Sequence, residues 1–162
     1  MPAVDQGVTL QVGRADPGSP EARRLLEAYF RELRERLAPA VVEIAARWPE
    51  DFRGPGGAVV LGWRAGHAVG CAGLRPLGEG TLELKHFFLV PDLRGHGLGR
   101  VLLTGVEDVA RSLGARRLVL DTATPLREAA ALYLSAGYAP IPRYNDNPHG
   151  SAWFGRVLDD AR

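Results

Sequence analysis

Short segments in which apolar and polar residues alternate are spread along most of this chain. An alternation with a period of two places every second side chain on the same face, as in a half-buried β-strand. Ala65 and Gly66 separate two of these segments and match a two-residue hairpin turn. The segments that we predict to be strands are VTLQV (8–12), AVVLGWR (58–64), HAVGCAGLR (67–75), TLELKHFFLV (81–90), RRLVLDT (116–122) and SAWFGRVL (151–158).

A second set of segments repeats its apolar residues every three to four positions, which is the spacing of an amphipathic helix. The first begins at Ser19 and Pro20, which favour the N-cap and the first position of a helix, and it is interrupted by Pro39. Glycines at 114 and 137 are typical of the residue that follows a helix. Besides the helix that starts at Pro20, we predict helices at 98–113 and 125–136, a short helix at 40–47 and a turn-rich loop at 49–57.

The composition is that of one ordinary globular domain, with 162 residues, 46% of them hydrophobic and 24% charged. The mixture of strand and helix patterns, without repeats or a linker, predicts a single α+β domain over 1–162. A formal net charge of +1 gives no reason to expect binding to nucleic acid or membranes. The lone Cys71 excludes an internal disulfide, and no signal-peptide or membrane-spanning pattern is evident, so we expect a cytoplasmic protein.

Residues 83–103 (ELKHFFLVPDLRGHGLGRVLL) place a glycine at every second position between a predicted strand and a predicted helix, at 95, 97 and 99. Such a loop leaves backbone N–H groups at the helix N-terminus, where the helix dipole also favours an anion. Without Cβ atoms, those N–H groups can approach phosphate oxygens closely. The spacing fits neither the dinucleotide-binding G-x-G-x-x-G pattern nor the P-loop pattern. The alternative to phosphate binding is a tight strand-to-helix turn.

The spacing that does fit is R-x-x-G-x-G, formed by Arg94, Gly97 and Gly99. Together with LVPDLRGHGLGRVLL and the downstream stretch AAALYLSAGY (129–138), it resembles the GNAT superfamily of N-acetyltransferases. That family wraps (Q/R)-x-x-G-x-(G/A) around the pyrophosphate of acetyl-coenzyme A. The stretches LDTATPLREAAALY and IPRYNDNP are similar to those of a bacterial subgroup. Leu126 departs from the pattern, because many members carry a cofactor-contacting asparagine there.

The resemblance implies the GNAT fold, a single mixed and mostly antiparallel sheet of six to seven strands flanked by about four helices. It implies acetyl-coenzyme A as co-substrate, no metal, an amine acceptor and, as is frequent in the family, a homodimer. Antibiotics, polyamines, amino acids and protein N-termini all offer such an amine. Carried over residue by residue, the resemblance places the Leu89 amide near the thioester oxygen. It predicts cofactor contacts at Phe88, Leu89, Val90, Arg94, Gly95, His96, Gly97, Leu98, Gly99 and Arg100.

Glu83 is the candidate general base, because histone-acetylating members of the family carry a catalytic glutamate eleven residues before the position of Arg94. A period of two puts Glu83, Lys85 and Leu89 on one face of the strand. The same period puts His86 on the opposite face, where we expect a packed residue. One alternative is that water alone takes the amine proton. The other is an exposed Glu83–Lys85 pair that only keeps the strand soluble.

Tyr133 matches the tyrosine that the family carries on the helix after its fifth strand. A phenol with a pKa of about 10 can protonate a departing alkanethiolate, so Tyr133 is the candidate general acid. The alternative is an aromatic residue that only packs in the core. The loop around Tyr144, Asn145 and Asp146 is either a contact to the acceptor or a solvated turn.

These features together predict an N-acetyltransferase that moves an acetyl group from acetyl-coenzyme A to a primary amine by direct attack on the thioester. Two other classes use the same loop: a coenzyme A-binding sensor without turnover, and a nucleotide- or sugar-phosphate-binding protein. The presence of both Glu83 and Tyr133 argues against the sensor. The missing P-loop lysine argues against the nucleotide-binding protein.

Overall fold

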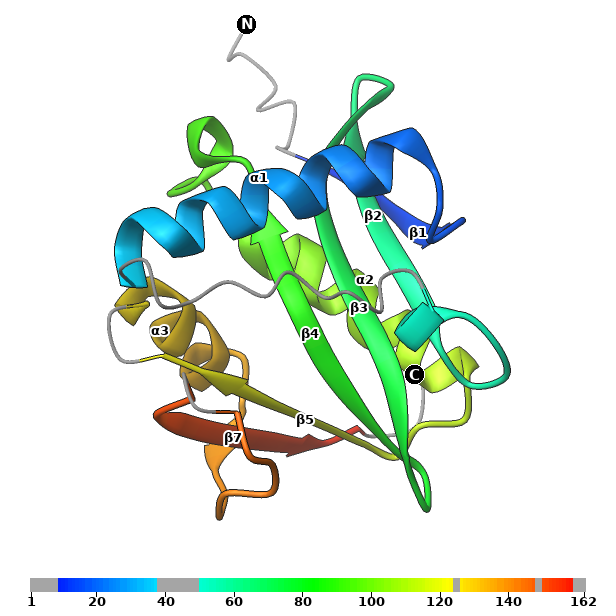
Figure 1. Ribbon diagram of the computed structural model, residues 1–162, viewed down its shortest axis with the longest axis vertical. Coiled ribbons are helices and arrows are strands. Elements are labelled where there is room, and N and C mark those ends of the chain that lie inside the picture. The colour runs from blue at the N-terminus through cyan, green and yellow to red at the C-terminus, as the bar shows by residue number, and fades with distance from the viewer. Residues whose placement is uncertain (1–8, 38–49, 124–125, 148–149, 159–162) are drawn as a thin grey trace, which may run out of the picture.

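The computed structural model describes residues 9–37, 50–123, 126–147 and 150–158, which form a seven-stranded sheet in the order β1-β2-β3-β4-β5-β7-β6 (Figure 1). β4 and β5 are parallel, and all other neighbouring strands are antiparallel. The strands are β1 (Gln11–Ala15), β2 (Ala58–Arg64), β3 (His67–Gly78), β4 (Thr81–Leu89), β5 (Arg117–Thr122), β6 (Ala139–Pro140) and β7 (Ala152–Val157). The helices are α1 (Pro20–Leu37), α2 (Leu98–Ser112) and α3 (Arg127–Ser135), with 3₁₀ turns at Glu50–Phe52 and Pro91–Leu93.

The predicted fold class, an α+β domain built on a mixed and mostly antiparallel sheet, is confirmed. The described residues contain three α-helices rather than about four, and the short helix predicted at 40–47 lies outside them. The first strand is shifted along the chain, because it runs over Gln11–Ala15 instead of 8–12. The sequence pattern did not indicate β6, since two residues carry no alternation.

Local sequence signals set the ends of several elements. The N–H of Ala22 donates to Ser19 Oγ (3.2 Å), so Ser19 is the N-cap that the sequence predicts for α1. Ala65 and Gly66 both have a positive φ (50° and 80°), as a two-residue turn between β2 and β3 requires. Gly114 follows α2 with a φ of 87°, in the left-handed region that glycine adopts at the end of a helix.

Helices cover both faces of the sheet (Figure 1). α1 crosses one face, where its apolar side packs on β2, β3 and β4. α2 and α3 cover the other face, above the largest cluster of buried residues. Burial of these apolar side chains is the main favourable contribution to folding. Within the described part of the chain, no helix has the length and apolar character needed to cross a bilayer.

A β-bulge in β4 interrupts the simple alternation of its side chains. Between the β3–β4 pairs Gly73–Lys85 and Cys71–Phe88, β4 contains one residue more than β3. His86 lies in this bulge with a φ of 55°, a conformation that few residues other than glycine adopt. Each residue after the bulge therefore points to the face opposite to the one that a period of two predicts.

The bulge makes two sequence predictions wrong. Leu84 lies in the cluster beneath α2, so its neighbour Glu83 faces the α1 side of the sheet. After the bulge, Leu89 lies in the α2 cluster and His86 packs against residues of α1. Glu83 and Leu89 are thus on opposite faces, and His86 shares a face with Glu83. The expectation that His86 is a packed residue is confirmed.

Candidate active site

β4 and β5 lie side by side only at their beginnings. Their parallel pairing joins Thr81–Glu83 to Arg117–Val119, after which the two strands diverge (Figure 1), and we call the region where their backbones separate the gap. The N–H of Val90 donates to the carbonyl of Val69 in β3 (2.9 Å). Because successive N–H groups of a strand point in opposite directions, the N–H of Leu89 points away from β3 and toward the gap. The end of β4 thus offers a backbone donor to whatever enters the gap.

A glycine in the left-handed region opens the helix that follows β4. Gly97 is the N-cap of α2, with φ 78° and ψ 1°, and no side chain caps the first turn. Gly95 also has a positive φ (82°), and a Cβ added at either glycine would meet nothing within 4 Å. The N–H groups of Leu98, Gly99 and Arg100 have no acceptor within the helix. The open space beside Gly95 and Gly97, next to these donors and the positive end of the helix dipole, is an arrangement that fits a phosphate.

The side chains of this loop turn to the protein or to solvent, so the loop offers backbone N–H groups rather than side chains to an anion. His96 is exposed, and Arg100 donates to a carbonyl at the end of α3 (3.0 Å). The Arg94 guanidinium donates to both carboxylate oxygens of Glu32 in α1 (2.8 and 3.0 Å). Its Nε donates to the carbonyl oxygen of Leu89 (2.9 Å). The R-x-x-G-x-G motif therefore presents its N–H groups, while its arginine side chain holds the surrounding elements.

Tyr133, on α3, is 5% exposed and lies beneath the gap. Its ring packs edge-on against Phe87 of β4 and Tyr138, and it is tilted against Phe154 of β7, with centroids 6.0, 5.7 and 6.4 Å away. Burial raises the pKa of the Tyr133 phenol above its ordinary value, so the hydroxyl keeps its proton. No described residue forms a hydrogen bond with that hydroxyl. A buried hydroxyl without a protein partner normally finds one in water or a ligand.

Glu83 lies at the other end of the gap and is fully buried. Arg75 Nε donates to its Oε1 (2.7 Å), and the Tyr144 hydroxyl and Asn145 Nδ2 donate to its Oε2 (2.7 and 3.2 Å). Lys85 Nζ lies 3.9 Å from the same Oε2. The alternative of an exposed Glu83–Lys85 pair is therefore wrong. The carboxylate belongs to a buried polar network instead.

The loop after β6 extends this network to a second carboxylate, Asp121 of β5. Asn145 Nδ2 also donates to Asp121 Oδ2, and Asn147 Nδ2 donates to Oδ1 (3.0 Å). Lys85 Nζ lies 3.6 Å from Asp121 Oδ2. Tyr144 and Asn145 thus point into the protein rather than forming a solvated turn, whereas Asp146 is exposed. Because backbone pairing of β4 and β5 has just stopped here, these side chains connect the two strands where the gap begins.

His86 closes the α1 side of this region. Its ring packs among Tyr29, Phe30 and Phe52, with centroids 5.6, 5.1 and 5.6 Å away. Burial, followed by the charge of Lys85, lowers the pKa of His86 to about 3. His86 is therefore neutral near pH 7, and its ring packs in the core rather than acting as an acid or base. Burial also raises the pKa of the Cys71 thiol to about 12, which makes that cysteine a poor nucleophile.

The predicted residues gather at two points along β4. The end of β4 and the glycine loop lie together, with Tyr133 beneath the gap on the α3 side. Glu83 approaches the gap from the α1 side, beside Tyr144 and Asn145. Among the described residues, no group of three or more histidine, cysteine, aspartate or glutamate side chains could hold a metal ion.

Sequence reasoning missed three residues of this region. Tyr29 and Glu32 lie on α1, and Glu32 meets Arg94 from 62 positions away, so no local pattern could reveal the contact. Asp121 had a signal, because it is the acidic residue of the LDT stretch that accompanies the Tyr144 loop in the bacterial subgroup. The structure explains this association, since that loop donates two side-chain hydrogen bonds to Asp121.

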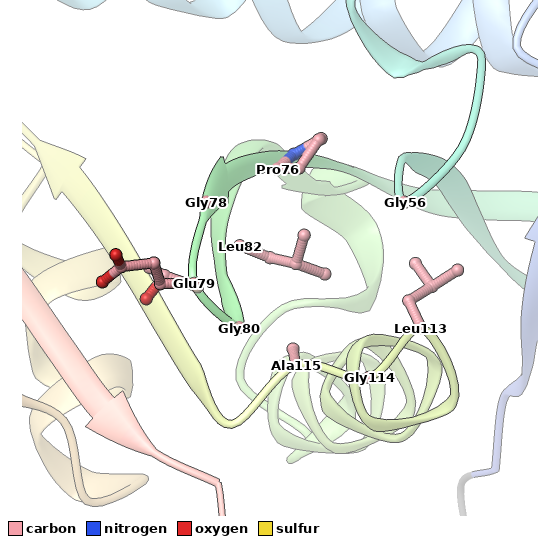
Figure 2. Close-up of a pocket in the computed structure, with 10 residues that line it drawn as sticks. Gly56, Pro76, Gly78, Glu79, Gly80, Leu82, Leu113, Gly114 and Ala115 are labelled. Carbon is pink, nitrogen blue, oxygen red and sulfur yellow. The ribbon is translucent and has the colours of Figure 1, made fainter.

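A shallow groove of about 210 Å³ lies at the opposite end of β4 from the glycine loop (Figure 2). Its walls come from the β3–β4 hairpin around Gly80 and from the end of α2 around Gly114. Figure 2 shows the Glu79 side chain directed away from the apolar side chains of Leu82 and Leu113. The groove offers glycine and aliphatic walls without a cluster of polar side chains, so it is not part of the candidate active site.

A mixed sheet whose two parallel strands diverge beside a glycine-rich helix start agrees with the fold that the motif resemblance implies. Residues 20–138 match the sequence profile of the acetyltransferase (GNAT) family, and the chain belongs to this family. An uncharacterised N-acetyltransferase from Schizosaccharomyces pombe is 31% identical over 129 residues, which cover 78% of this chain and 79% of that protein. The resemblance inferred from the motifs is thereby confirmed.

Solved structures show the same fold. A GNAT-family acetyltransferase from Staphylococcus aureus has a TM-score of 0.77 at 17% identity, covering 93% of this chain and 100% of that one. A GNAT-family acetyltransferase from Elizabethkingia anophelis, solved with acetyl-coenzyme A bound, has a TM-score of 0.66 at 20% identity, covering 93% and 99%. At these identities the structural likeness establishes the fold, while the sequence match establishes the family.

Proposed function

We propose that this protein transfers the acetyl group of acetyl-coenzyme A to a primary amine by direct attack of the amine on the thioester. The observation that carries the proposal is a set of three features around the point where β4 and β5 diverge, contributed by β4, α2 and α3. They are the uncapped glycine turn, the Leu89 N–H that points into the gap, and the buried Tyr133 hydroxyl without a described partner. Membership of the acetyltransferase family and the acetyl-coenzyme A bound to the Elizabethkingia protein support this choice of donor.

The backbone of β4 and of the glycine loop would hold the donor. In this proposal the N–H groups of 95–100 bind the pyrophosphate, and Phe88, Leu89 and Val90 line the path of the pantetheine arm. Bound acetyl-coenzyme A supplies the acetyl group as an activated thioester. The Leu89 N–H then donates to the carbonyl oxygen, on which negative charge develops during attack. Fixing both reactants beside one strand edge also lowers the entropic cost of their encounter.

Transfer forms an N–C bond and breaks the C–S bond, so nitrogen must lose a proton and sulfur must gain one. Tyr133 is kept protonated by its burial, and we assign it the proton that sulfur receives. We assign Glu83 the proton that nitrogen loses. Because Glu83 is fully buried and accepts a hydrogen bond from Tyr144, the proton would pass through Tyr144. The Tyr144 oxygen takes the amine proton as its own proton moves to Glu83 Oε2.

The test is a thiol-release assay with acetyl-coenzyme A and a panel of amines: aminoglycosides, polyamines, amino acids and peptides with a free N-terminus. We expect thiol release that depends on one class of amine and exceeds hydrolysis without amine. Acetyl-coenzyme A binding without thiol release for every amine would identify a sensor instead. Equal affinities for ATP and coenzyme A, measured by calorimetry, would point to a general nucleotide-binding protein.

A further inference from the structure

The Arg94 side chain connects the glycine loop to two other elements. Its two terminal nitrogens donate to the two oxygens of Glu32 (2.8 and 3.0 Å), and its Nε donates to the Leu89 carbonyl (2.9 Å). A two-point guanidinium–carboxylate contact fixes orientation as well as distance. The guanidinium also lies over the ring of Phe88, 5.4 Å from its centroid. Arg94 and Glu32 are only 32% and 24% exposed, so solvent screens their charges less than those of a surface pair.

One end of this contact fixes the peptide that follows the Leu89 N–H. The Leu89 carbonyl accepts from Arg94, and the N–H of the same peptide, on Val90, donates to Val69 (2.9 Å). The Leu89–Val90 peptide is therefore held from opposite sides. Its rotation would turn the Leu89 backbone, including the N–H that we assign to the thioester oxygen. A small rotation there would misdirect that donor.

The other end of the contact fixes α1 over the sheet. Glu32 lies one helical turn after Tyr29, so the two side chains emerge from neighbouring positions of the helix. Tyr29 packs against His86 (5.6 Å) and Phe88 (6.1 Å) on β4. The Arg94–Glu32 pair thus joins the glycine loop, the end of β4 and the helix that covers the α1 side of the gap.

We propose that Arg94 is a positioning residue that acts through Glu32 and the Leu89 carbonyl, and that its side chain does not bind the pyrophosphate. The pair fixes the direction of the Leu89 N–H and the position of α1 on the sheet. Backbone N–H groups alone bind the phosphates. Three of the five N–H groups of the guanidinium already donate to these protein oxygens. This assignment departs from the cofactor contact that the R-x-x-G-x-G motif suggests for this side chain. It rests on the proposed function only for the rate measurement described next.

Glu32→Gln distinguishes the two roles of Arg94 because they predict opposite effects. If Arg94 positions, Glu32→Gln and Arg94→Gln each lower kcat on the order of 10- to 100-fold through misplacement of the Leu89 donor. Calorimetry should then show coenzyme A affinity within about twofold of wild type, because the backbone site is intact. The double variant should be no slower than the single ones, since both changes break one contact. Glu128→Gln is the control, because it breaks a second two-point arginine–carboxylate contact of α1, that of Arg36, and leaves the three hydrogen bonds of Arg94 in place.

Two results would overturn the assignment. If Glu32→Gln binds coenzyme A more tightly than wild type while Arg94→Gln binds it more weakly, Glu32 competes with phosphate for the guanidinium. Unchanged kcat in a folded Glu32→Gln protein would show that the pair positions nothing. Hydrogen exchange across 84–94 gives a readout without turnover: protection should fall in Glu32→Gln but not in Glu128→Gln. If the wild type releases no thiol with any amine, the proposed function fails, and calorimetry and hydrogen exchange still decide the role of Arg94.

Discussion

At the scale of single residues, removing the Tyr133 hydroxyl distinguishes a packing role of this side chain from a catalytic one. Tyr133→Phe keeps the ring contacts with Phe87 and Tyr138, so we expect little change in stability. If the hydroxyl protonates the departing sulfur, kcat should fall by roughly 10²–10⁴-fold. Affinity for acetyl-coenzyme A should stay close to wild type, because the proton is needed only as charge builds on sulfur. Steady-state kinetics and calorimetry on the same preparation measure both quantities.

Tyr138→Phe is the matched control for this experiment. Tyr138 is also buried, but its hydroxyl donates to Glu107 Oε2 (2.9 Å), away from the gap. Its loss should cost about 1 kcal/mol of stability and leave kcat unchanged. A Tyr133→Phe protein with wild-type kinetics, under conditions where chemistry limits the rate, removes Tyr133 from the mechanism. The rate defect should also shrink with an acyl donor whose thiol is more acidic, since that leaving group needs less protonation.

Glu83 and Tyr144 give a second prediction at this scale. If the amine proton passes through Tyr144 to Glu83, then Tyr144→Phe and Glu83→Gln should both lower turnover most at low pH, where little amine is neutral. Raising the pH should recover part of each loss. The double variant should be about as slow as either single variant, because both break the same proton path. A pH–rate profile for Tyr144→Phe that overlays the wild-type profile would show that water takes the proton without this hydroxyl.

At the scale of elements, the turn between β4 and α2 predicts a loss of cofactor binding without loss of the fold. Gly97 has a φ of 78° and Gly114 a φ of 87°, and a Cβ at either would meet nothing within 4 Å. Alanine at either position should therefore cost a similar 1–2 kcal/mol, about the strain of a left-handed residue. Only Gly97→Ala should also lose cofactor binding. Calorimetry should show that its affinity for acetyl-coenzyme A and for 3′,5′-ADP is at least roughly tenfold lower than that of the wild type. Equal affinities in the two variants would contradict the phosphate assignment.

Helix ends and turns that are determined by residues close together in the chain could be predicted from the sequence. The Ser19 cap, the Ala65–Gly66 turn and the glycine after α2 each act within a few residues, and the structure contains all three. The strand around Glu83 was also correctly predicted, but its bulge was not. A φ of 55° at His86 depends on packing against α1 and the 50–52 turn, which lie far away in sequence.

The candidate site divides in the same way. The glycine turn that we propose binds phosphate could be predicted, because its glycines at 95, 97 and 99 lie close together in the chain and their spacing indicates the backbone conformation they allow. The surroundings of Glu83 could not be predicted, because Arg75 and Tyr144 reach it from β3 and from the loop after β6. A carboxylate in an alternating strand gives no sign of being fully buried. Only the tertiary contacts show that donors surround it.

At the scale of the whole molecule, His86 makes stability depend on pH. Its pKa is lowered from 6.5 to about 3 in the folded protein by burial first, so between these values the unfolded state binds the extra proton. Stability therefore rises with pH through this window and is lost as pH falls below 6.5. The slope contributed by this residue approaches about 1.4 kcal/mol per pH unit. Urea titrations from pH 6.5 to about pH 5 should show it as a fall in the free energy of unfolding.

Two variants isolate the contribution of His86. His86→Asn tolerates the positive φ and does not titrate, so its stability should vary less with pH than that of the wild type. His67→Asn, at an exposed position at the start of β3, controls for the loss of an imidazole elsewhere in the chain. Because other titrating groups are common to all three proteins, they cancel in the comparison. Parallel slopes for wild type and His86→Asn would show that His86 gains a proton without unfolding.

The account as a whole depends on one chemical claim, that an amine attacks the thioester directly in the gap between β4 and β5. The most direct measurement is the product balance with isotopically labelled acetyl-coenzyme A and an amine selected from the panel. Mass spectrometry should find one N-acetylated amine for each free thiol released, and no acetylated protein when the amine is omitted. Label on the protein that later passes to the amine, or thiol release accompanied only by free acetate, would contradict direct transfer.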